Sequence, residues 1–255
     1  MPAGYEAPRR SCAAGHGLWY DDAVTGRLLA ALGWAAGLTA GGAPSAPGEV
    51  SRRAMVEEQL VARGIRDPRV LDAMRKVPRH EFVPEKLRAS AYEDEPLPIG
   101  RGQTISQPFI VAYMAEALAL RGGERVLEVG SGSGYAAAVL SLLAADVHGI
   151  ELEGELHARS VATLARLGYR NVHLRHGDGF LGWPEAAPFD AILLSCAAEE
   201  IPGPLWEQLG EGGRFLYPRG LPGGFQELVI VTKTAKGPVV RRLEPVRFVP
   251  MRRAP

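Results

Sequence analysis

A glycine-rich run directly after a short apolar stretch is the feature that most constrains the fold of this chain. Residues 126–129 have the sequence VLEV, and residues 130–134 have the sequence GSGSG. An apolar stretch before a glycine cluster predicts a strand, and the apolar pattern from residue 134 onward predicts a helix. Glycines at such a turn let the backbone bend tightly and approach a ligand without an interfering Cβ. The run therefore predicts a strand, a turn that holds a ligand, and a helix.

Short apolar segments and helical patterns alternate along the rest of the chain. We predict strands at 125–129, 146–150, 171–175, 189–194, 213–217, 226–233 and 239–249, and helices at 134–144, 153–167 and 202–209. This alternation is typical of an α/β fold, here a Rossmann-like, doubly wound and mostly parallel sheet. Because the last strands follow one another without a helix, we expect an antiparallel hairpin at the edge of the sheet.

The segment before this sheet has a different pattern. Within residues 51–121, apolar residues at helical spacing predict two short helices and then a third from Ile110 to Leu120. A long polar connection at 91–109 precedes the third helix, and loops of that length in a compact domain are usually functional. We therefore expect one domain at 51–255, with 51–121 as an N-terminal helical segment on the substrate side.

Residues 1–50 form an atypical leader that is rich in glycine, alanine and proline. Its apolar stretch from Leu28 to Leu38 is too short to span a bilayer, but it has the length of a signal-peptide apolar region. Two aspartates precede this stretch and suit a signal peptide poorly, whereas a translation start at Val24 would remove them. Two interpretations stay open, a signal peptide within residues 24–46 and a disordered extension. The first implies export, and the second a cytoplasmic protein.

The overall composition excludes several classes of partner. Lysine plus arginine equals aspartate plus glutamate, at 29 each, so the balanced charge predicts neither nucleic acid nor an anionic membrane as partner. Cys12 and Cys196 are the two cysteines, and we expect both to be free thiols. Neither CxxC nor HExxH occurs, so we expect no metal site. We also expect a monomer.

The residues around the glycine turn favour one class of nucleotide ligand. A dinucleotide fingerprint would place its third glycine where the chain has Tyr135, and a P-loop would need Gly-Lys-Ser/Thr. A hydrolase nucleophile elbow would need serine at Gly132. Glu128 would repel a pyrophosphate but suits a ligand with an ammonium group and no phosphate. We therefore expect S-adenosylmethionine as cofactor.

Residues after the next three strands extend this expectation. Glu151 ends the second strand about twenty residues past the first glycine, where a carboxylate binds both ribose hydroxyls. After the third strand, Asp178 lies in an Asp-Gly turn and could accept a hydrogen bond from the adenine amino group. Residues 195–198, with the sequence SCAA, follow the fourth strand and are small enough to leave room for a substrate.

These residues resemble the protein-L-isoaspartate O-methyltransferase family over about residues 51–251. The most specific match is GQTISQP at 102–108, and RHEFVP at 79–84 and VRFVP at 246–250 match as well. The resemblance implies an enzyme that methylates the α-carboxyl of L-isoaspartyl residues in damaged proteins and so starts their repair to aspartate. The alternatives are a methyltransferase for another carboxylate and a non-catalytic cofactor-binding adaptor.

The resemblance also implies roles for individual residues. Ser106 matches the active-site serine of the family. The expected cofactor contacts are Glu128, Gly130, Ser131, Gly132, Gly134, Glu151, Asp178 and Gly179. The expected substrate contacts are Thr104, Ile105, Gln107, Ala197 and Gln226. The chain departs from the family at Ser195-Cys196, where a threonine or alanine run is more usual, and this departure bears on substrate preference.

The chemistry of the expected substrate limits what the site has to supply. An α-carboxyl of this kind has a pKa of about 3.5, so it is ionised at neutral pH and needs no general base. Alignment for an in-line displacement can contribute roughly 7–11 kcal/mol, and partial removal of water from the carboxylate helps further. We therefore expect the Ser106 hydroxyl to orient the carboxylate by a hydrogen bond, not to act as a nucleophile.

Overall fold

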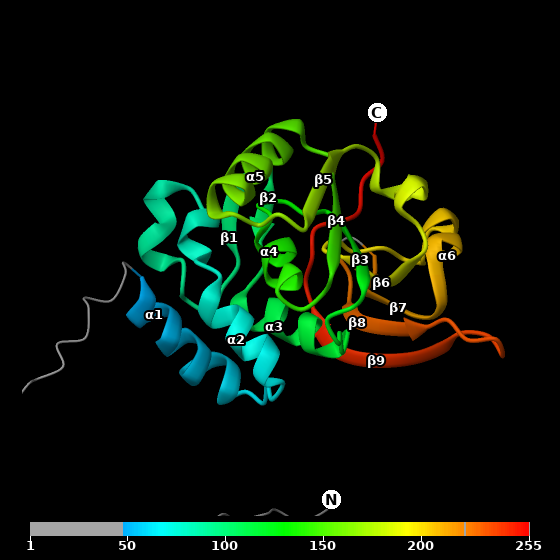
Figure 1. Ribbon diagram of the computed structural model, residues 1–255, viewed down its shortest axis with the longest axis horizontal. Coiled ribbons are helices and arrows are strands. Elements are labelled where there is room, and N and C mark those ends of the chain that lie inside the picture. The colour runs from blue at the N-terminus through cyan, green and yellow to red at the C-terminus, as the bar shows by residue number, and fades with distance from the viewer. Residues whose placement is uncertain (1–47, 222, 255) are drawn as a thin grey trace, which may run out of the picture. The chain divides into compact units, whose positions relative to one another are not determined.

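A computed structural model of the chain describes residues 48–221 and 223–254, all within one compact unit (Figure 1). The predictions on residues 1–47, which include the signal peptide, the disordered extension and the free thiol of Cys12, lie outside the described residues. In the described part, no helix is long and apolar enough to cross a membrane.

A seven-stranded sheet forms the centre of the molecule, with strand order β5-β4-β3-β6-β7-β8-β9. The strands are β3 (Arg125–Val129), β4 (Asp146–Glu151), β5 (Val172–His176), β6 (Phe189–Leu194), β7 (Leu209–Gly220), β8 (Gln226–Thr232) and β9 (Val239–Val246). The neighbouring strands β5, β4, β3, β6 and β7 pair in parallel. Strand β8 pairs antiparallel with both β7 and β9. The predicted α/β class, the mostly parallel sheet and the antiparallel edge are confirmed.

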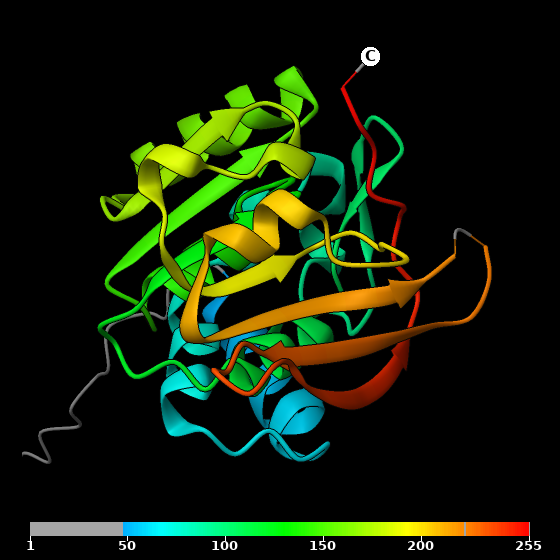
Figure 2. The ribbon, with the colours of Figure 1, turned by 90° about the vertical axis from the view of Figure 1, so that its right-hand side faces the viewer.

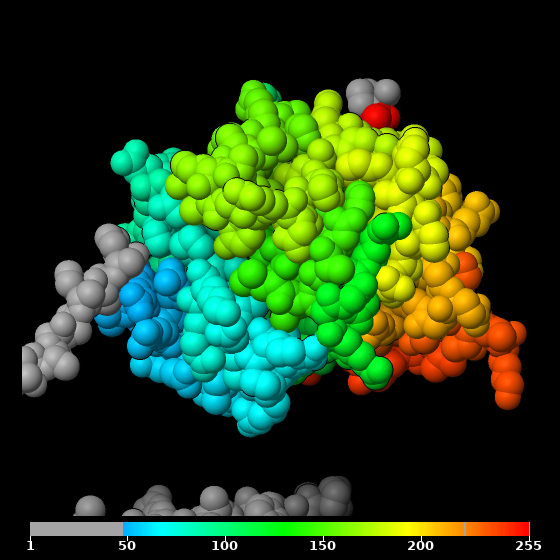
Figure 3. Space-filling view, viewed as in Figure 1, coloured from blue at the N-terminus to red at the C-terminus, as the bar shows by residue number. Residues whose placement is uncertain are grey.

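Helices cover both faces of this sheet. They are α1 (Glu49–Ala54), which continues as a π-helix at Met55–Val61, α2 (Pro68–Lys76), α3 (Pro108–Ala117), α4 (Tyr135–Ser141), α5 (Gly154–Leu167) and α6 (Gly203–Gln208). The π-helix and helices α2 to α5 contribute to the larger hydrophobic cluster, and α6 contributes Leu205 to the second. In the space-filling view, the blue and cyan surface of the N-terminal helices adjoins green residues (Figure 3), and α2 contacts both α3 and α4. The predicted N-terminal helical segment is therefore confirmed.

The connection at 91–109 contains structure that its sequence did not predict. Strands β1 (Leu97–Gly100) and β2 (Gln103–Ile105) form a two-stranded antiparallel sheet, and α3 begins at Pro108, before the expected Ile110. The turn between β1 and β2 has positive φ at Arg101 (55°) and Gly102 (69°). Hairpin turns of this kind usually carry Asn-Gly or Asp-Gly. The Arg-Gly pair lacks this signature, so the sequence did not predict the hairpin. Short 3-10 helices lie at Arg79–Phe82, Glu85–Ser90, Gly179–Leu181 and Pro184–Ala186.

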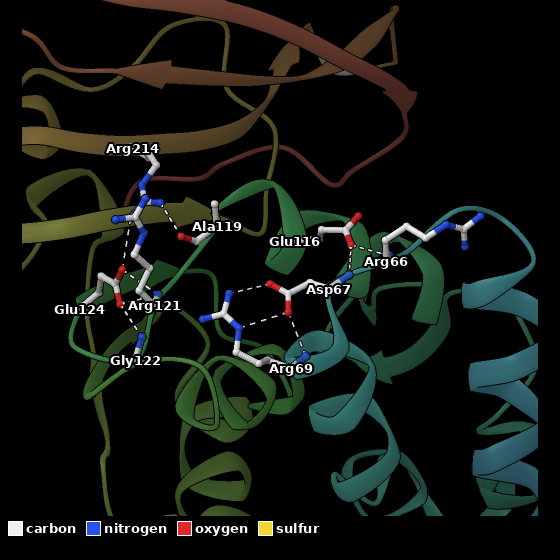
Figure 4. Close-up of polar contacts among 9 residues, drawn as sticks. All are labelled: Arg66, Asp67, Arg69, Glu116, Ala119, Arg121, Gly122, Glu124 and Arg214. Atoms are coloured by element: carbon white, nitrogen blue, oxygen red, sulfur yellow. Dashed lines mark hydrogen bonds and ion pairs between the residues drawn. The ribbon is translucent and has the colours of Figure 1, made fainter.

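A polar network fixes the N-terminal helices to the sheet (Figure 4). Glu116 of α3 accepts hydrogen bonds from the amides of Arg66 and Asp67, both at 2.6 Å, just before α2 begins. Beyond α3, Arg214 of β7 donates to the carbonyl of Ala119 at 2.8 Å and lies 3.6 Å from Glu124. The helical segment is thus anchored at the end of the sheet where β3 begins.

The order of the strands determines where a ligand can bind. The chain runs from β3 outward to β4 and β5, and then returns to β6 on the other side of β3. Ligands bind in such sheets beyond the carboxyl ends of the strands at this point of reversal. Figure 2 shows that the C-terminal segment after β9, in red, returns to this end and passes beside the hairpin of β1 and β2.

Candidate active site

The glycine turn after β3 adopts the tight geometry that its sequence predicts. Gly130, Gly132 and Gly134 have φ values of 83°, 53° and 84°, a left-handed region that favours glycine. A Cβ at Gly134 would lie 3.1 Å from Leu164 and 3.2 Å from Ser160 of α5. The turn therefore packs closely on α5 and leaves its other side open for a ligand.

Glu151 holds this turn from the end of the neighbouring strand. Its buried carboxylate accepts hydrogen bonds from the amide of Gly132 at 2.7 Å and from the amide of Glu153 at 2.9 Å. Each carboxylate oxygen has a second lone pair, so both can still accept a ribose hydroxyl. The structure places Glu151 on the wall of a pocket together with Gly130, Gly132 and Gly179.

Glu128 is a buried acid whose hydrogen bonding is incomplete. Its side chain is 1% exposed, Oε1 accepts from the Ser195 hydroxyl at 2.8 Å, and Oε2 has no partner. Burial raises the pKa of Glu128 to about 7, the Ser195 hydrogen bond opposes this, and the charge of Glu151 adds to it. An unpartnered buried carboxylate oxygen fits a ligand that brings a cation, such as the ammonium of S-adenosylmethionine.

Three adjoining pockets lie at this end of the sheet, and Thr104 and Ser195 line all of them. The first, the cofactor pocket, encloses about 570 Å³ between β3, β4 and the C-terminal segment. The second, the junction pocket, encloses about 320 Å³ and is lined by Thr104, Ile105, Ser106, Val111, Glu128, Gly130, Ser131, Gly132, Ser133, Tyr135, Ala136 and Ser195. The third, the outer pocket, encloses about 1000 Å³ and is lined by Pro96, Thr104, Ser106, Gln107, Ile110, Ser195, Pro245, Val246, Arg247, Phe248 and Val249.

The segment around Ser106 is held by one carboxylate. The side-chain amide of Gln107 donates hydrogen bonds to the backbone carbonyl and to Oδ2 of Asp94, both at 2.8 Å. The backbone amide of Phe109 donates to Oδ1 of Asp94 at 3.2 Å. Arg63 pairs with the same carboxylate and stacks on the Phe109 ring. Within the described residues, the Ser106 hydroxyl makes no hydrogen bond, so it is free to bind a ligand in the junction or outer pocket.

Two of the predicted substrate residues act on the backbone of the C-terminal segment. Gln226 is buried, accepts from the amide of Phe248 at 2.7 Å and donates to its carbonyl at 3.2 Å. Ala197 bonds through its backbone to the carbonyl of Val249 and to the amide of Met251, both at 2.8 Å. Neither residue lines any of the three pockets itself. Each instead fixes the C-terminal segment, whose residues form part of the pocket walls.

The remaining predicted residues fall on the walls or beside them. Thr104, Ile105, Gln107, Ser131 and the glycines of the turn line one or more pockets, except for Gly134, which packs on α5. Gly179 lines the cofactor pocket, and a Cβ there would lie 2.3 Å from Val129. The carboxylate of Asp178 accepts a hydrogen bond from the backbone amide of Phe180 at 2.9 Å and so caps the short 3-10 helix Gly179–Leu181.

Sequence reasoning missed two parts of the site. Val249 to Arg252 line the cofactor pocket, although VRFVP was noted only as a matching motif. Ser195 was noted only as a departure in a run of small residues, yet it bonds Glu128 across 67 positions of sequence. No local signal marks that bond, because it depends on β6 pairing with β3.

In the part of the chain that the structure describes, Cys196 and the histidines do not form a metal-binding cluster. Cys196 is a free, buried thiol, and burial together with Glu151 and Glu128 raises its pKa to about 12, so it is neutral. In residues 48–221 and 223–254, no group of three or more histidine, cysteine, aspartate or glutamate side chains could hold a metal ion.

Comparisons with known proteins agree with this geometry. Residues 50–254 match the family model described as protein-L-isoaspartate(D-aspartate) O-methyltransferase. A protein-L-isoaspartate O-methyltransferase 2 of Anaeromyxobacter sp. strain Fw109-5 is 69% identical over 236 residues, covering 89% of this chain and 97% of the relative. A protein-L-isoaspartate O-methyltransferase of Opitutus terrae is 57% identical over 202 residues, covering 79% and 87%.

Solved structures give the same result. A protein-L-isoaspartate O-methyltransferase superposes with a TM-score of 0.71 at 31% identity, covering 78% of this chain and 65% of that one. A Plasmodium falciparum protein in complex with S-adenosyl-L-homocysteine superposes with a TM-score of 0.69 at 29% identity, covering 79% and 98%. This chain therefore belongs to the protein-L-isoaspartate(D-aspartate) O-methyltransferase family, whose members use S-adenosylmethionine in the repair of isoaspartyl proteins.

Proposed function

We propose that Ser106 and the walls of the three adjoining pockets carry out methyl transfer to the α-carboxyl of L-isoaspartyl residues. The observation that carries this assignment is the position of Ser106. Its hydroxyl has no partner within the described residues, and it lines both the junction pocket beside Glu128 and the outer pocket beside Phe248. A group bound to Ser106 can therefore face the cofactor side and the substrate side at once.

The residues of the cofactor side fit S-adenosylmethionine, which supplies the methyl group on a sulfonium. Glu128 offers its unpartnered oxygen to the ammonium, and Glu151 offers its remaining lone pairs to the ribose hydroxyls. Gly179 packs against Val129 on the wall of the cofactor pocket, and Asp178 next to it is the candidate partner of the adenine amino group. The glycine turn lets the backbone approach the amino-acid portion closely.

The substrate side has to align a carboxylate that is already ionised. The Ser106 hydroxyl donates a hydrogen bond to one carboxylate oxygen and leaves the other oxygen directed at the methyl group. Arg247 lines the outer pocket, is exposed, and makes no ion pair with any described residue, so its charge attracts an anionic substrate. Ser106 thus contributes orientation, and no general base is needed.

The product is a methyl ester, whose further reaction needs no residue of this chain. The backbone amide nitrogen that follows the damaged residue attacks the ester carbonyl and expels methanol, which closes a succinimide. Hydrolysis of the succinimide then returns part of the material to normal aspartate. The enzyme therefore only has to activate the carboxyl group and release the ester.

Methyl transfer to matched peptides tests this function. An isoaspartyl peptide and its normal aspartyl twin are incubated with the protein and radiolabelled S-adenosylmethionine, and methyl ester formation is measured. We expect transfer to the isoaspartyl peptide alone. Transfer to neither peptide would contradict the repair function, and equal transfer to both would favour a less specific carboxyl methyltransferase.

We further propose that the enzyme acts as a monomer in the cytoplasm, without nucleic acid. The residues of one chain fill all the roles that the proposed mechanism needs, so the mechanism requires no second copy. Sedimentation equilibrium tests the oligomeric state, and a dimer at micromolar concentration would contradict the proposal. Export through residues 24–46 is the alternative to the cytoplasm, and N-terminal sequencing of the native protein distinguishes the two.

A further inference from the structure

Ser195 occupies a special place at the end of β6. Its amide donates to the carbonyl of Val129 on β3 at 2.9 Å, and its hydroxyl donates to Glu128 of the same strand at 2.8 Å. A serine after a strand is commonly a turn residue. Here its side chain instead enters a buried part of the site and lines all three pockets.

We propose that Ser195 is a positioning residue for the cofactor: its hydroxyl holds one oxygen of Glu128 so that the other oxygen meets the cofactor's ammonium. This inference rests on the proposed function, in which Glu128 receives that ammonium. Glu128 is 1% exposed and its Oε2 has no partner, whereas Oε1 is fixed by Ser195. Without that bond, the carboxylate could rotate within its cavity, and the free oxygen would lose its defined direction.

The Ser195 hydrogen bond has a large effect on whether Glu128 is ionised, because the other charged group near Glu128 disfavours its ionisation. Glu151 on β4 repels a negative charge on Glu128, and Cys196 after β6 and Tyr135 on α4, both with pKa raised to about 12, are neutral. The Ser195 hydroxyl is the largest influence that lowers the pKa of Glu128, which burial raises to about 7. Removal of this hydroxyl therefore raises that pKa further and leaves Glu128 more protonated near neutral pH.

A residue at this position needs a hydroxyl to hold Glu128. Threonine keeps such a hydroxyl, whereas alanine does not. A Ser195→Thr variant should therefore behave like the wild type, and Ser195→Ala should not. Ser141→Ala is a matched control, because Ser141 is a buried serine of α4 whose hydroxyl bonds only the carbonyl of Ala138, and it lines none of the three pockets.

Calorimetric binding of S-adenosylhomocysteine between about pH 6 and pH 8.5 tests the inference. At pH 7 we expect Ser195→Ala to weaken binding about tenfold, with Ser195→Thr and Ser141→Ala within about twofold of the wild type. As the pH rises to about 8.5, Glu128 ionises in both proteins and the deficit of Ser195→Ala should shrink. Methylthioadenosine lacks the amino-acid portion, so the variant should bind it like the wild type.

Other outcomes overturn the inference. Equal binding of S-adenosylhomocysteine by Ser195→Ala and the wild type at every pH would do so. A deficit that also affects methylthioadenosine, which has no ammonium, would show that Ser195 only packs against the pocket. If the wild type itself failed to bind S-adenosylhomocysteine, the proposed function would fall, and this inference with it, so the two failures are distinguishable.

Discussion

The cofactor side and the substrate side of the site are built in different ways. On the cofactor side, Glu128, the glycine turn and Glu151 stand at the ends of neighbouring strands, and the pairing of β3, β4 and β6 fixes them. On the substrate side, the loop around Ser106 and the C-terminal segment are irregular. Single side chains hold them, Asp94 for the first and Gln226 for the second.

This difference suggests a division of labour between the two sides. Changes at Ser106 and at its support Asp94 should affect turnover and leave cofactor affinity intact, because neither residue lines the cofactor pocket. Changes at Glu128 should alter cofactor affinity and its pH dependence. Substitutions on either side can therefore separate the two functions or show that they cannot be separated.

The largest effect is expected for Ser106→Ala. Loss of the hydrogen bond that aligns the carboxylate should lower kcat about 100-fold, since small misplacements cost that much in a reaction governed by alignment. The affinity for S-adenosylhomocysteine should stay within about twofold of the wild type. Steady-state kinetics and calorimetry measure the two quantities. An unchanged kcat would remove Ser106 from the mechanism.

Glu128→Gln should weaken the binding of S-adenosylhomocysteine roughly thirtyfold at pH 8, because a neutral amide replaces the carboxylate that meets the ammonium. The same variant should be more stable than the wild type without cofactor. Burial raises the pKa of Glu128 from its usual value near 4.5 to about 7. Its contribution to stability is thus fully present below pH 4.5 and is lost as the pH rises through about 7.

The stability gain of Glu128→Gln should therefore depend on pH. It should be close to zero at about pH 4.5 and reach at most about 3 kcal/mol in the free energy of unfolding above pH 8. Chemical denaturation at both pH values measures it. A gain that is equal at both would mean that Glu128 does not change its protonation in this range.

Asp94→Asn should lower kcat/KM roughly tenfold. An asparagine amide cannot accept hydrogen bonds from Gln107, Phe109 and Arg63 together, so the loop around Ser106 should lose part of its support. Glu93→Gln is the matched control, since Glu93 is exposed and its side chain makes no hydrogen bond or ion pair with a described residue. Cofactor affinity should not change in either variant. A parallel loss of cofactor affinity in Asp94→Asn would show that the two sides share one support.

The smallest effect concerns Cys196, which lines the cofactor pocket but is not expected to react. With its pKa raised to about 12, the thiol should resist alkylation by iodoacetamide in the folded protein at pH 8. Mass spectrometry after a timed exposure measures this, with a cysteine peptide in the same tube as control. Modification of Cys196 as fast as the peptide would show that the thiol is accessible and ionised.

The same difference explains how much could be predicted from the sequence. On the cofactor side the signals are local. A glycine run and an acid at a strand end mark Glu128 and Glu151 as predicted cofactor contacts, and both residues line pockets. The predicted strands 125–129 and 189–194 also match β3 and β6 residue for residue. Both stretches are apolar and lie in the middle of the sheet, so burial decides their conformation.

On the substrate side, the signals are not local. The hairpin of β1 and β2 turns on an Arg-Gly pair that gives no usual turn signature. The anchors of the site join residues far apart, such as Gln226 and Phe248, so their partners are defined only once the sheet has formed. Gln226 was predicted to contact substrate, and the structure shows it holding the segment that forms the wall of the outer pocket. Whether its side chain also meets the peptide stays a prediction.

A crystal structure with S-adenosylhomocysteine and an isoaspartyl peptide bound would test the central assignment most directly. The proposed mechanism predicts the α-carboxylate in the junction pocket, within about 3 Å of the Ser106 hydroxyl, with its other oxygen facing the thioether sulfur. The ammonium should lie against the free oxygen of Glu128. A peptide carboxylate bound away from Ser106, with the hydroxyl unengaged, would contradict the mechanism.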